Sequence, residues 1–528
     1  MHVFNRTSLQ AAAALASISL LSGCGVFSDS ESAGEKRIVV GTTSSPSTLD
    51  PAASWDNSWE LFRNVFQTLV SFPTGSTTPQ SDAADCKFTD TSSRVFECTL
   101  REGLTFSNGH KLDAKAVQHS IERIRTIDHE GGPNGMLGSL QAVETVGERR
   151  VVFRLNRPDA TFPFVLATPA MSLVDPAEYP ADKLRTDGKI TGSGPYVLDS
   201  YEERKSAVLT KNPSYKGFAE HKNSAVTIRY FDESEAMVTA LKKKEIDATY
   251  RGLTAAEVVE LQDGNNPENE SLQIIESTGA DIRYLVFNAT DATVAKPAVR
   301  KAIAQVVDRE ALVSTVYQGT AEPLYSMVPK GIAAHTTKFY DRFGSPSVPK
   351  AKALLREAGI TEPVQLTFGY ATDRYGSATA AEFAELKRQL EASGLFKVTL
   401  VGKPWKEFQN GYQKGQYPVF GRGWFPDFPD PDNFVAPFMG KKNVLGTPYE
   451  SRRITDELLP QSRRESDRAA VTDEFVEAQE IMVRDVRLLP LWQGKLYIAA
   501  GEDIGGGERA LDPQTVMQLW ELSRLASW

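Results

Sequence analysis

Apolar and polar positions alternate between strand-like and helix-like patterns along the whole chain. Residues 36–42 ("KRIVVGT") and 282–288 ("IRYLVFN") are short apolar runs rich in β-branched and aromatic residues, which predict strands. Residues 112–126 place apolar side chains at helical spacing behind Asp113, which predicts an amphipathic helix with Asp113 as its N-cap. This alternation predicts an α/β fold.

Several later segments repeat the helical period and end at glycine, which stops a helix at low conformational cost. The chain has 528 residues, more than the roughly 250–300 that one hydrophobic core organises, so we expect at least two lobes. The small polar stretch 277–283 ("STGADIR") suggests a lobe boundary near residue 280. The other predicted helices are 57–70, 234–244 (running into residues 245–250), 349–359 and 380–394, with a helical pair over 296–317, and residues 147–155 predict a turn and a strand.

The N-terminus departs from this globular pattern. Arg6 precedes a mostly apolar run, residues 8–21, that is too short for a stable membrane span, so residues 1–23 are predicted to be a signal peptide. The run ends in "LSGC", which resembles a bacterial lipobox and predicts lipidation of Cys24. The polar residues 24–35 then form a flexible tether, and the protein is anchored by lipid to the extracytoplasmic face of the cell membrane. A plain secretory cleavage site is the alternative.

The two remaining cysteines flank a predicted turn. Cys86 and Cys98 enclose "KFTDTSSRVFE", in which "DTSS" has turn chemistry between two short alternating segments. A hairpin there brings both thiols together outside the cytoplasm, where disulfides persist. We therefore predict a Cys86–Cys98 disulfide, with two free thiols as the alternative. The six histidines are scattered, so no metal site and no cofactor is predicted.

Composition and charge narrow the functional classes. The chain is 41% hydrophobic and 24% charged, which is typical of a soluble globular protein. Its formal net charge of −9 and the lack of a long basic run argue against a nucleic-acid partner. The sequence contains no nucleophile elbow, no zinc-protease motif and no phosphate-binding loop, so no catalytic residue is predicted and the protein is not expected to be an enzyme.

Seven stretches, in order along nearly all of the mature chain, resemble the dipeptide- and oligopeptide-binding lipoproteins of ABC importers, family 5 of the extracytoplasmic solute-binding proteins. Each stretch is a weak signal, and the specificity lies in their order and combined coverage. They are "TLDPA" (48–52), "TLREGLTFSNGHKLDAKAVQHSIERI" (99–124), "TGSGPYVL" (191–198), "EIDA" (245–248), "YLVFNATDATVAKPAVRKAIAQVVDREAL" (284–312), "VPKAKALLREAG" (348–359) and "GWFPDFPDPDNF" (423–434).

The resemblance implies a two-lobed periplasmic-binding-protein-like clamp of three domains, with a hinge and a ligand cleft between the lobes. It implies a discontinuous domain I, a compact domain II and an opposite lobe that forms domain III. The glycines of "TGSGPY" are expected to serve a turn near the cleft or the crossover. The implied ranges are 36–70, 190–283 and 495–528 for domain I, 71–189 for domain II, and 284–494 for domain III.

The same resemblance assigns the ligand-binding residues. In this family the acid three residues after the "GW" pair binds the peptide's α-ammonium, and that position is Asp427. Prolines on both sides stiffen the loop that presents it, while a structural turn role is the alternative. Trp424 and Trp405 are candidates for lining the cleft, with core packing as the alternative. Arg374 is similar in position to the arginine that binds the ligand's α-carboxylate, and Arg422 is its rival.

The implied function is an extracytoplasmic receptor that captures short peptides and delivers them to an ABC transporter permease. Monomeric behaviour is expected from the resemblance alone. A relative of the same fold could instead bind a nickel chelate, haem, a sugar or a siderophore. A surface receptor for a peptide signal and a secreted hydrolase are the alternatives from other functional classes.

Overall fold

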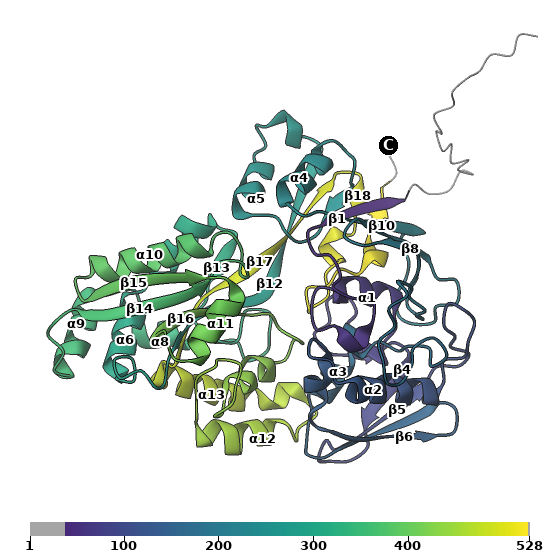
Figure 1. The fold of residues 1–528 in the computed structure, drawn as a ribbon, viewed down its shortest axis with the longest axis horizontal. Coiled ribbons are helices and arrows are strands. Elements are labelled where there is room, and N and C mark those ends of the chain that lie inside the picture. The colour runs from purple at the N-terminus through teal and green to yellow at the C-terminus, as the bar shows by residue number, and fades with distance from the viewer. Residues whose placement is uncertain (1–36, 526–528) are drawn as a thin grey trace, which may run out of the picture. The chain divides into compact units, whose positions relative to one another are not determined.

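The computed structural model describes residues 37–525, so the predicted signal peptide, Cys24 and the tether lie outside the described residues. The described residues bury their apolar side chains in separate clusters on either side of two long strands, β12 (Leu272–Phe287) and β17 (Leu488–Gly501). We call residues 37–271 and 502–525 the first lobe and residues 288–487 the second lobe. Both long strands run between the two lobes (Figure 1).

The first lobe contains a small antiparallel sheet, an extension of a larger sheet, and five helices. Its strands are β1 (Ile38–Thr42), β2 (Val70–Ser71), β3 (Gln80–Ser81), β4 (Ala84–Phe88), β5 (Val95–Leu100), β6 (Leu140–Val146), β7 (Arg150–Leu155), β8 (Tyr196–Glu202), β9 (Ser206–Lys211), β10 (Ala225–Tyr230), β11 (Ala248–Thr249), β18 (Ile504–Gly505) and β19 (Ser523–Arg524). Its helices are α1 (Trp59–Val65), α2 (Ala114–Ile127), α3 (Phe162–Leu166), α4 (Ser234–Lys242) and α5 (Ala255–Leu261).

The second lobe packs helices around the other end of the larger sheet. Its strands are β13 (Ala321–Pro323), β14 (Val364–Ala371), β15 (Phe396–Lys403) and β16 (Val419–Trp424). Its helices are α6 (Pro297–Val306), α7 (Arg309–Leu312), α8 (Lys338–Phe343), α9 (Val348–Glu357), α10 (Thr379–Ala392), α11 (Trp405–Gln413), α12 (Leu459–Ser462) and α13 (Thr472–Asp485).

One mixed sheet of 11 strands extends through both lobes. Its order is β15-β14-β16-β12-β17-β11-β1-β10-β9-β8, and β13 pairs with β17 beside this path. β14 runs parallel to β15 and β16, whereas β12 runs antiparallel to β16 and β17. A separate sheet of the order β4-β5-β7-β6 lies in the first lobe. The predicted α/β class is therefore confirmed.

The crossing between the lobes depends on a close approach of β12 and β17. The register of the pair shifts between Thr278 and Ile282. A Cβ added at Gly279 would lie 2.5 Å from the carbonyl oxygen of Gly494, closer than real Cβ atoms approach. The polar stretch 277–283, expected to link the lobes, is thus an irregular part of a continuous strand rather than a loop.

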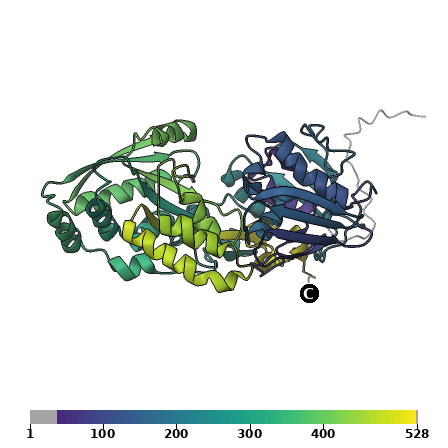
Figure 2. The ribbon, with the colours of Figure 1, turned by 90° about the horizontal axis from the view of Figure 1, so that it is seen from below.

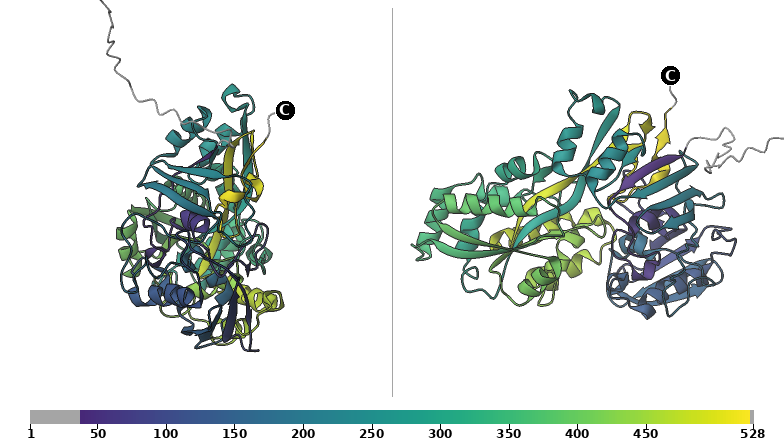
Figure 3. Two further views of the ribbon diagram at one scale, coloured as in Figure 1. Left: turned by 90° about the vertical axis from the view of Figure 1, so that its right-hand side faces the viewer. Right: turned by 45° about the horizontal axis from the view of Figure 1, so that its top comes forward.

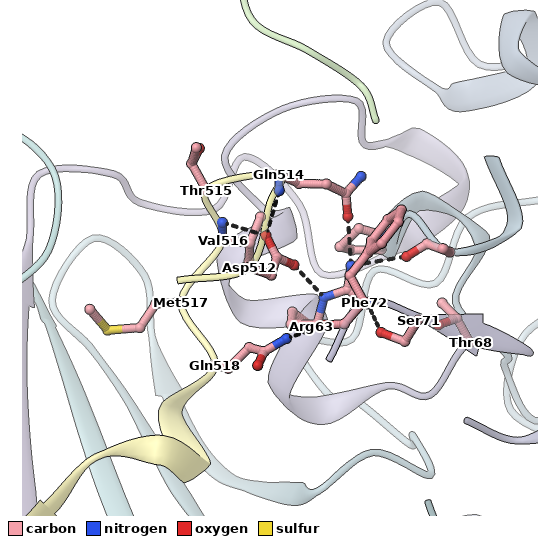
Figure 4. Close-up of polar contacts among 12 residues, drawn as sticks. Arg63, Thr68, Ser71, Phe72, Asp512, Gln514, Thr515, Val516, Met517 and Gln518 are labelled. Carbon is pink, nitrogen blue, oxygen red and sulfur yellow. Dashed lines mark hydrogen bonds and ion pairs between the residues drawn. The ribbon is translucent and has the colours of Figure 1, made fainter. Parts of the chain in front are cut away.

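The two ends of the described chain pack together in the first lobe. Arg63 of α1 forms an ion pair with Asp512 (3.2 Å), and it donates from Nη2 to Oε1 of Gln514 (2.7 Å). Figure 4 shows these contacts joining the helix to the C-terminal segment. That segment lies beside β1 and β10 in two views (Figures 1 and 3), and Trp520 is fully buried in the first-lobe core.

Most predicted elements are present, with different boundaries. Asp113 caps α2 by accepting from the backbone N–H groups of Lys115 and Ala116, as predicted. The predicted strand 282–288 is the last part of β12, which begins ten residues earlier. The predicted helix 57–70 is shorter, because α1 ends at Val65 and Val70 already belongs to β2.

The hairpin that carries the cysteines is confirmed. β4 pairs with β5 so that Cys86 lies opposite Cys98, and the two residues form a disulfide with their Cα atoms 4.1 Å apart. Both strands continue the small first-lobe sheet through the pairing of β5 with β7. The disulfide therefore closes an edge hairpin of that sheet.

The glycines of "TGSGPY" are needed for a reason other than the predicted turn. Neither Gly192 nor Gly194 has a positive φ angle. A Cβ at Gly192 would lie 2.0 Å from the Val65 carbonyl oxygen, and a Cβ at Gly194 would lie 2.5 Å from the Val65 carbonyl carbon. These glycines allow their segment to pass directly against the end of α1.

Candidate ligand-binding site

The loop after β16 is fixed by one asparagine. Asn433 accepts hydrogen bonds through Oδ1 from the Trp424 indole N–H (3.1 Å) and from the Asp427 backbone N–H (2.9 Å). It also donates through Nδ2 to Oδ2 of Asp427 (3.0 Å). With Pro426 and Pro429 restricting the backbone, these three bonds hold the Asp427 carboxylate in one orientation.

The Asp427 carboxylate receives its second hydrogen bond from the first lobe. Trp55 donates its indole N–H to Oδ1 of Asp427 (2.7 Å), and Gln514 donates to the Asp427 carbonyl oxygen. Gln514 is the same residue that accepts from Arg63, so this interaction links the loop to the buried ion pair drawn in Figure 4. The loop is therefore positioned by both lobes.

Asp427 has only neutral donors. Burial raises the pKa of Asp427, and the hydrogen bonds from Asn433 and Trp55 oppose that rise only in part. Among the described residues, no lysine or arginine forms an ion pair with Asp427. Asp427 is partly buried, and a partly buried carboxylate without a cation is stabilised by an ammonium group that a ligand brings to it.

The two other acids of the loop are structural. Asp430 caps the short 3₁₀ helix Pro431–Phe434 by accepting from the backbone N–H of Asp432, as expected for a cap residue. It also forms a two-bond ion pair with Arg468 (2.7 and 3.0 Å). Asp432 forms the same kind of pair with Arg463 (2.8 and 2.9 Å).

These ion pairs lie where the second lobe meets the first. The carbonyl oxygens of Arg463 and Arg464 accept hydrogen bonds from the Ala160 backbone N–H and the Ser93 hydroxyl, both 2.9 Å long. Phe428 packs into the first-lobe core, with its ring 6.0 Å from that of Phe164. Figure 2 shows α12 beside the small first-lobe sheet, in agreement with these contacts.

Three arginines and three aromatic residues gather at the second-lobe side of the site. The Arg374 guanidinium lies 4.3 Å from the Trp405 ring, and the Arg422 guanidinium lies 5.5 Å from the same ring. The Arg283 guanidinium lies 4.9 Å from the Tyr375 ring. We call this set the arginine–aromatic cluster: Arg283, Arg374, Arg422, Tyr375, Trp405 and Tyr412.

The predicted site residues differ in exposure. Arg374 is exposed in the loop between β14 and α10, whereas Arg422 is buried on β16 and donates to the Val444 carbonyl oxygen (2.8 Å). Trp405 begins α11 and is partly buried. Trp424 is also partly buried and packs edge-on against Phe438, with the ring centroids 5.4 Å apart. Each tryptophan thus has a packing role, and the structure brings Arg374, Arg422 and Trp405 together.

Two contributors to the site were missed by sequence reasoning. Trp55 is 44% exposed in spite of its size, and it lies three residues after the "TLDPA" stretch that had already been singled out. An exposed tryptophan beside that stretch was the available signal. Gln514 offered no comparable signal, because it has neither charge nor a motif around it.

The described part of the chain contains neither a membrane-spanning helix nor a metal-ligand cluster. Within residues 37–525, no helix combines the length and the apolar composition that a membrane crossing requires. The histidine, cysteine, aspartate and glutamate residues of that range form no group of three or more suited to a metal ion.

Comparisons with known proteins identify the family. A probable D,D-dipeptide-binding periplasmic protein of Escherichia coli K12 is 26% identical over 490 residues, covering 89% of this chain and 90% of that protein. HbpA2 of Haemophilus parasuis has a similar fold, with a TM-score of 0.81 at 20% identity, over 93% of this chain and all of that chain.

A dipeptide-binding protein of Pseudoalteromonas sp. SM9913, solved in complex with Met-Leu, aligns with a TM-score of 0.75 at 20% identity over 93% of this chain and 100% of that one. These structures confirm the clamp-type α/β fold. The family model of the bacterial extracellular solute-binding proteins, family 5 (middle region), matches residues 78–446. The chain therefore belongs to family 5 of the bacterial extracellular solute-binding proteins, a family of binding proteins rather than enzymes.

Proposed function

We propose that this chain is a receptor that binds short peptides outside the cell and delivers them to the permease of an ABC importer. The observation that carries the proposal is the Asp427 carboxylate, which is oriented by Asn433 and Trp55 and has no cationic partner among the described residues. A free α-ammonium group is the cation that every unmodified peptide carries. The peptide ligands named for two of the proteins above support the same conclusion.

The other end of the ligand is assigned to the arginine–aromatic cluster. Arg374 is exposed and stacks on Trp405, so its guanidinium is accessible to the α-carboxylate of a peptide and is held in place by the indole. Trp405 and Trp424 border the ligand between these two charges. Peptide backbone groups and water would supply the remaining contacts, which makes binding tolerant of side-chain sequence.

The decisive experiment is native mass spectrometry of the full chain, purified in detergent and mixed with a library of di- to hexapeptides. We expect the wild-type chain to retain peptides and Asp427→Asn, which preserves size and removes the charge, to lose them. Asp85→Asn, at an exposed position of β4, is the matched control and should behave as wild type. Retention of a chelate, haem, sugar or siderophore mass in place of peptides would overturn the peptide assignment.

We also propose that the chain acts on the ligand only by binding it. Peptides incubated with the purified chain should keep their masses over time. Progressive loss of the peptide mass would favour a hydrolase instead. The expected monomer is tested on the same sample by light scattering.

The location of the receptor is a further part of the proposal. Removal of residues 1–23, lipidation of Cys24 and the tether 24–35 would hold the clamp at the outer face of the cell membrane. We expect Cys24→Ser to move the protein from the membrane fraction to the soluble extracytoplasmic fraction and to abolish the acyl mass. The division into three domains, with bending of β12 and β17 as the closing motion, belongs to the same proposal.

A further inference from the structure

Arg422 is a buried cation with no anionic partner in the described residues. Only 9% of its surface is exposed. Its Nη1 donates to the Val444 carbonyl oxygen (2.8 Å), and its Nε has no hydrogen-bond partner. The guanidinium lies 4.9 Å from the Tyr412 ring and 5.5 Å from the Trp405 ring. Burial lowers the pKa of Arg422, but the tyrosines around it, one of which (Tyr375) also shares a side-chain hydrogen bond with it, raise the pKa above its ordinary value, so the guanidinium stays charged. No carboxylate among the described residues forms an ion pair with this charge, and an anion brought by a ligand would neutralise it.

Other buried arginines have their partners within the protein. Arg123 forms two hydrogen bonds with the Asp50 carboxylate, and Arg63 pairs with Asp512. Arg309 also lacks a carboxylate, but it packs on Tyr325 and donates to the Pro490 carbonyl oxygen, outside the arginine–aromatic cluster. Arg422 therefore differs from Arg123 and Arg63 in lacking a carboxylate, and from Arg309 in its position within the arginine–aromatic cluster.

The position of Arg422 connects it to the proposed ligand. It lies on β16 two residues before Trp424, so both side chains face the same side of the strand. It shares the Trp405 ring with the exposed Arg374, and the Trp405 backbone N–H donates to Oδ1 of Asp373 (2.8 Å). Two guanidinium groups thus lie against the Trp405 ring. The single α-carboxylate of a peptide can neutralise only one of them.

The pKa of Tyr375 is affected by these arginines. Burial raises the pKa of its phenol, yet Arg422, the hydrogen bond from the Gly423 backbone, Arg374 and Arg283 together bring the pKa below its ordinary value. Arg283 lies against the other face of β16. A Cβ at Gly423 would lie 2.7 Å from Nη1 of Arg283. That same Nη1 of Arg283 forms an ion pair with Asp281 (3.4 Å), so the positive charge without a carboxylate partner lies on the Arg422 side of the strand.

We propose that the ligands of this receptor are acidic peptides, in which the α-carboxylate binds Arg374 and the side-chain carboxylate of a C-terminal Asp or Glu binds Arg422. This inference rests on the proposed peptide-binding function and adds its substrate class. Arg422 would then be the residue that determines specificity, because it lies deeper than Arg374 and is satisfied only by a second anion.

The test compares pairs of peptides that differ in charge and share their shape. Ala-Glu and Ala-Gln, and their analogues lengthened by one and two N-terminal alanines, are titrated calorimetrically into the full chain. A charge-assisted bond to a buried guanidinium predicts that the Glu peptides bind roughly 10- to 100-fold more tightly than the Gln peptides. Equal affinities would overturn the acidic preference and leave the peptide-binding function standing. Failure of every peptide to bind would overturn both.

Three variants distinguish Arg422 from its neighbours. In Arg422→Gln the Glu-to-Gln affinity ratio should fall to about 1, and in Arg422→Lys part of the preference should return. Arg374→Gln should weaken both peptides of a pair alike and leave their ratio, because both carry an α-carboxylate. Arg309→Gln, a buried arginine outside the cluster, is the matched control. A wild-type ratio in Arg422→Gln would assign the preference to another residue and overturn the proposal.

Discussion

Arg123 in the first lobe and Arg422 in the second are both buried, and they are compensated in opposite ways. Arg123 donates two hydrogen bonds to the Asp50 carboxylate (2.7 and 2.6 Å) and two more to the carbonyl oxygens of Pro180 and Lys183. Arg422 donates to the Val444 carbonyl oxygen, shares a side-chain hydrogen bond with Tyr375 and lies over the rings of Trp405 and Tyr412, and it has no carboxylate partner among the described residues. Arg123 thus stabilises the fold through a carboxylate of the same chain, whereas Arg422 is proposed to bind a carboxylate of the ligand.

The acids show the same contrast. Asp430 and Asp432 are each paired with an arginine, whereas Asp427, in the same loop, is bonded only to neutral donors. Charges that fix the lobes are paired inside the chain, and charges at the site are left without a counter-charge. This difference is the basis on which we propose Asp427 and Arg422 as ligand-binding residues.

The largest effect should follow from breaking the paired arginine. Asp50→Asn leaves the Arg123 guanidinium buried without its counter-charge, so we expect the free energy of unfolding to fall by about 3–5 kcal/mol. Denaturant unfolding of the full chain measures the change. Asp85→Asn, an exposed aspartate in the same lobe, should change it by less than about 0.5 kcal/mol. A loss below about 1 kcal/mol in Asp50→Asn would show that the Asp50–Arg123 ion pair matters little for stability, so that Arg123 and Arg422 would not differ in this respect.

The unpaired carboxylate should titrate with ligand binding. Because burial raises the pKa of Asp427 in the free protein and an ammonium would lower it, binding at low pH must release a proton. Peptide affinity should therefore fall as the pH drops through the raised pKa, by up to about tenfold per pH unit, and should be constant above it. Calorimetry between about pH 4.5 and 7.5 measures this. Asp427→Asn should bind peptide weakly at every pH, and wild-type affinity with the same pH dependence in this variant would contradict the assignment.

Removing the neutral donor should sharpen the contrast. Trp55→Phe deletes the indole hydrogen bond to Asp427, which we expect to cost about 1 kcal/mol of stability and to raise the pKa of Asp427 further. The pH profile of peptide binding should move to higher pH in this variant. A double-mutant cycle with Asp427→Asn isolates the pair, and additive effects would show that the two residues are not coupled.

The smallest change in stability is expected at Arg422. Arg422→Met removes a buried charge that has no carboxylate partner. The contacts that are lost are offset because the variant no longer has a desolvated charge, so the free energy of unfolding should change by no more than about 1 kcal/mol. Arg123→Met is the comparison, since it strands the Asp50 carboxylate and should cost several times more. Comparable losses in both variants, measured by denaturant unfolding, would show that Arg422 is structural.

Much of the fold and part of the site could be predicted from local signals. Asp113 and the glycines that end helices mark element boundaries through their own backbone chemistry, and the turn between Cys86 and Cys98 predicts the hairpin that joins them. Asp427 could be singled out because its motif is local and resembles that of a known family. These predictions needed no knowledge of distant contacts.

The rest depends on residues that are far apart in the sequence. Trp55 is 372 residues from Asp427, and Gln514 is 87 residues from it, so nothing near the acid indicates either partner. The first half of β12 mixes apolar residues with polar ones and contains Gly279, and it is a strand because β17 pairs with it. Asp432 has the appearance of a turn residue until the fold brings Arg463 to it.

The participation of residues 498–522 in the first-lobe core has a consequence for biosynthesis. Ile498, Leu519 and Trp520 fill space between residues that are made hundreds of positions earlier, whereas the core of the second lobe needs nothing beyond Trp492. As the chain emerges during synthesis or export, the second lobe has all its parts first, and the first lobe must wait, incomplete, for the last segment. A nascent first lobe is therefore the part most in need of chaperone protection.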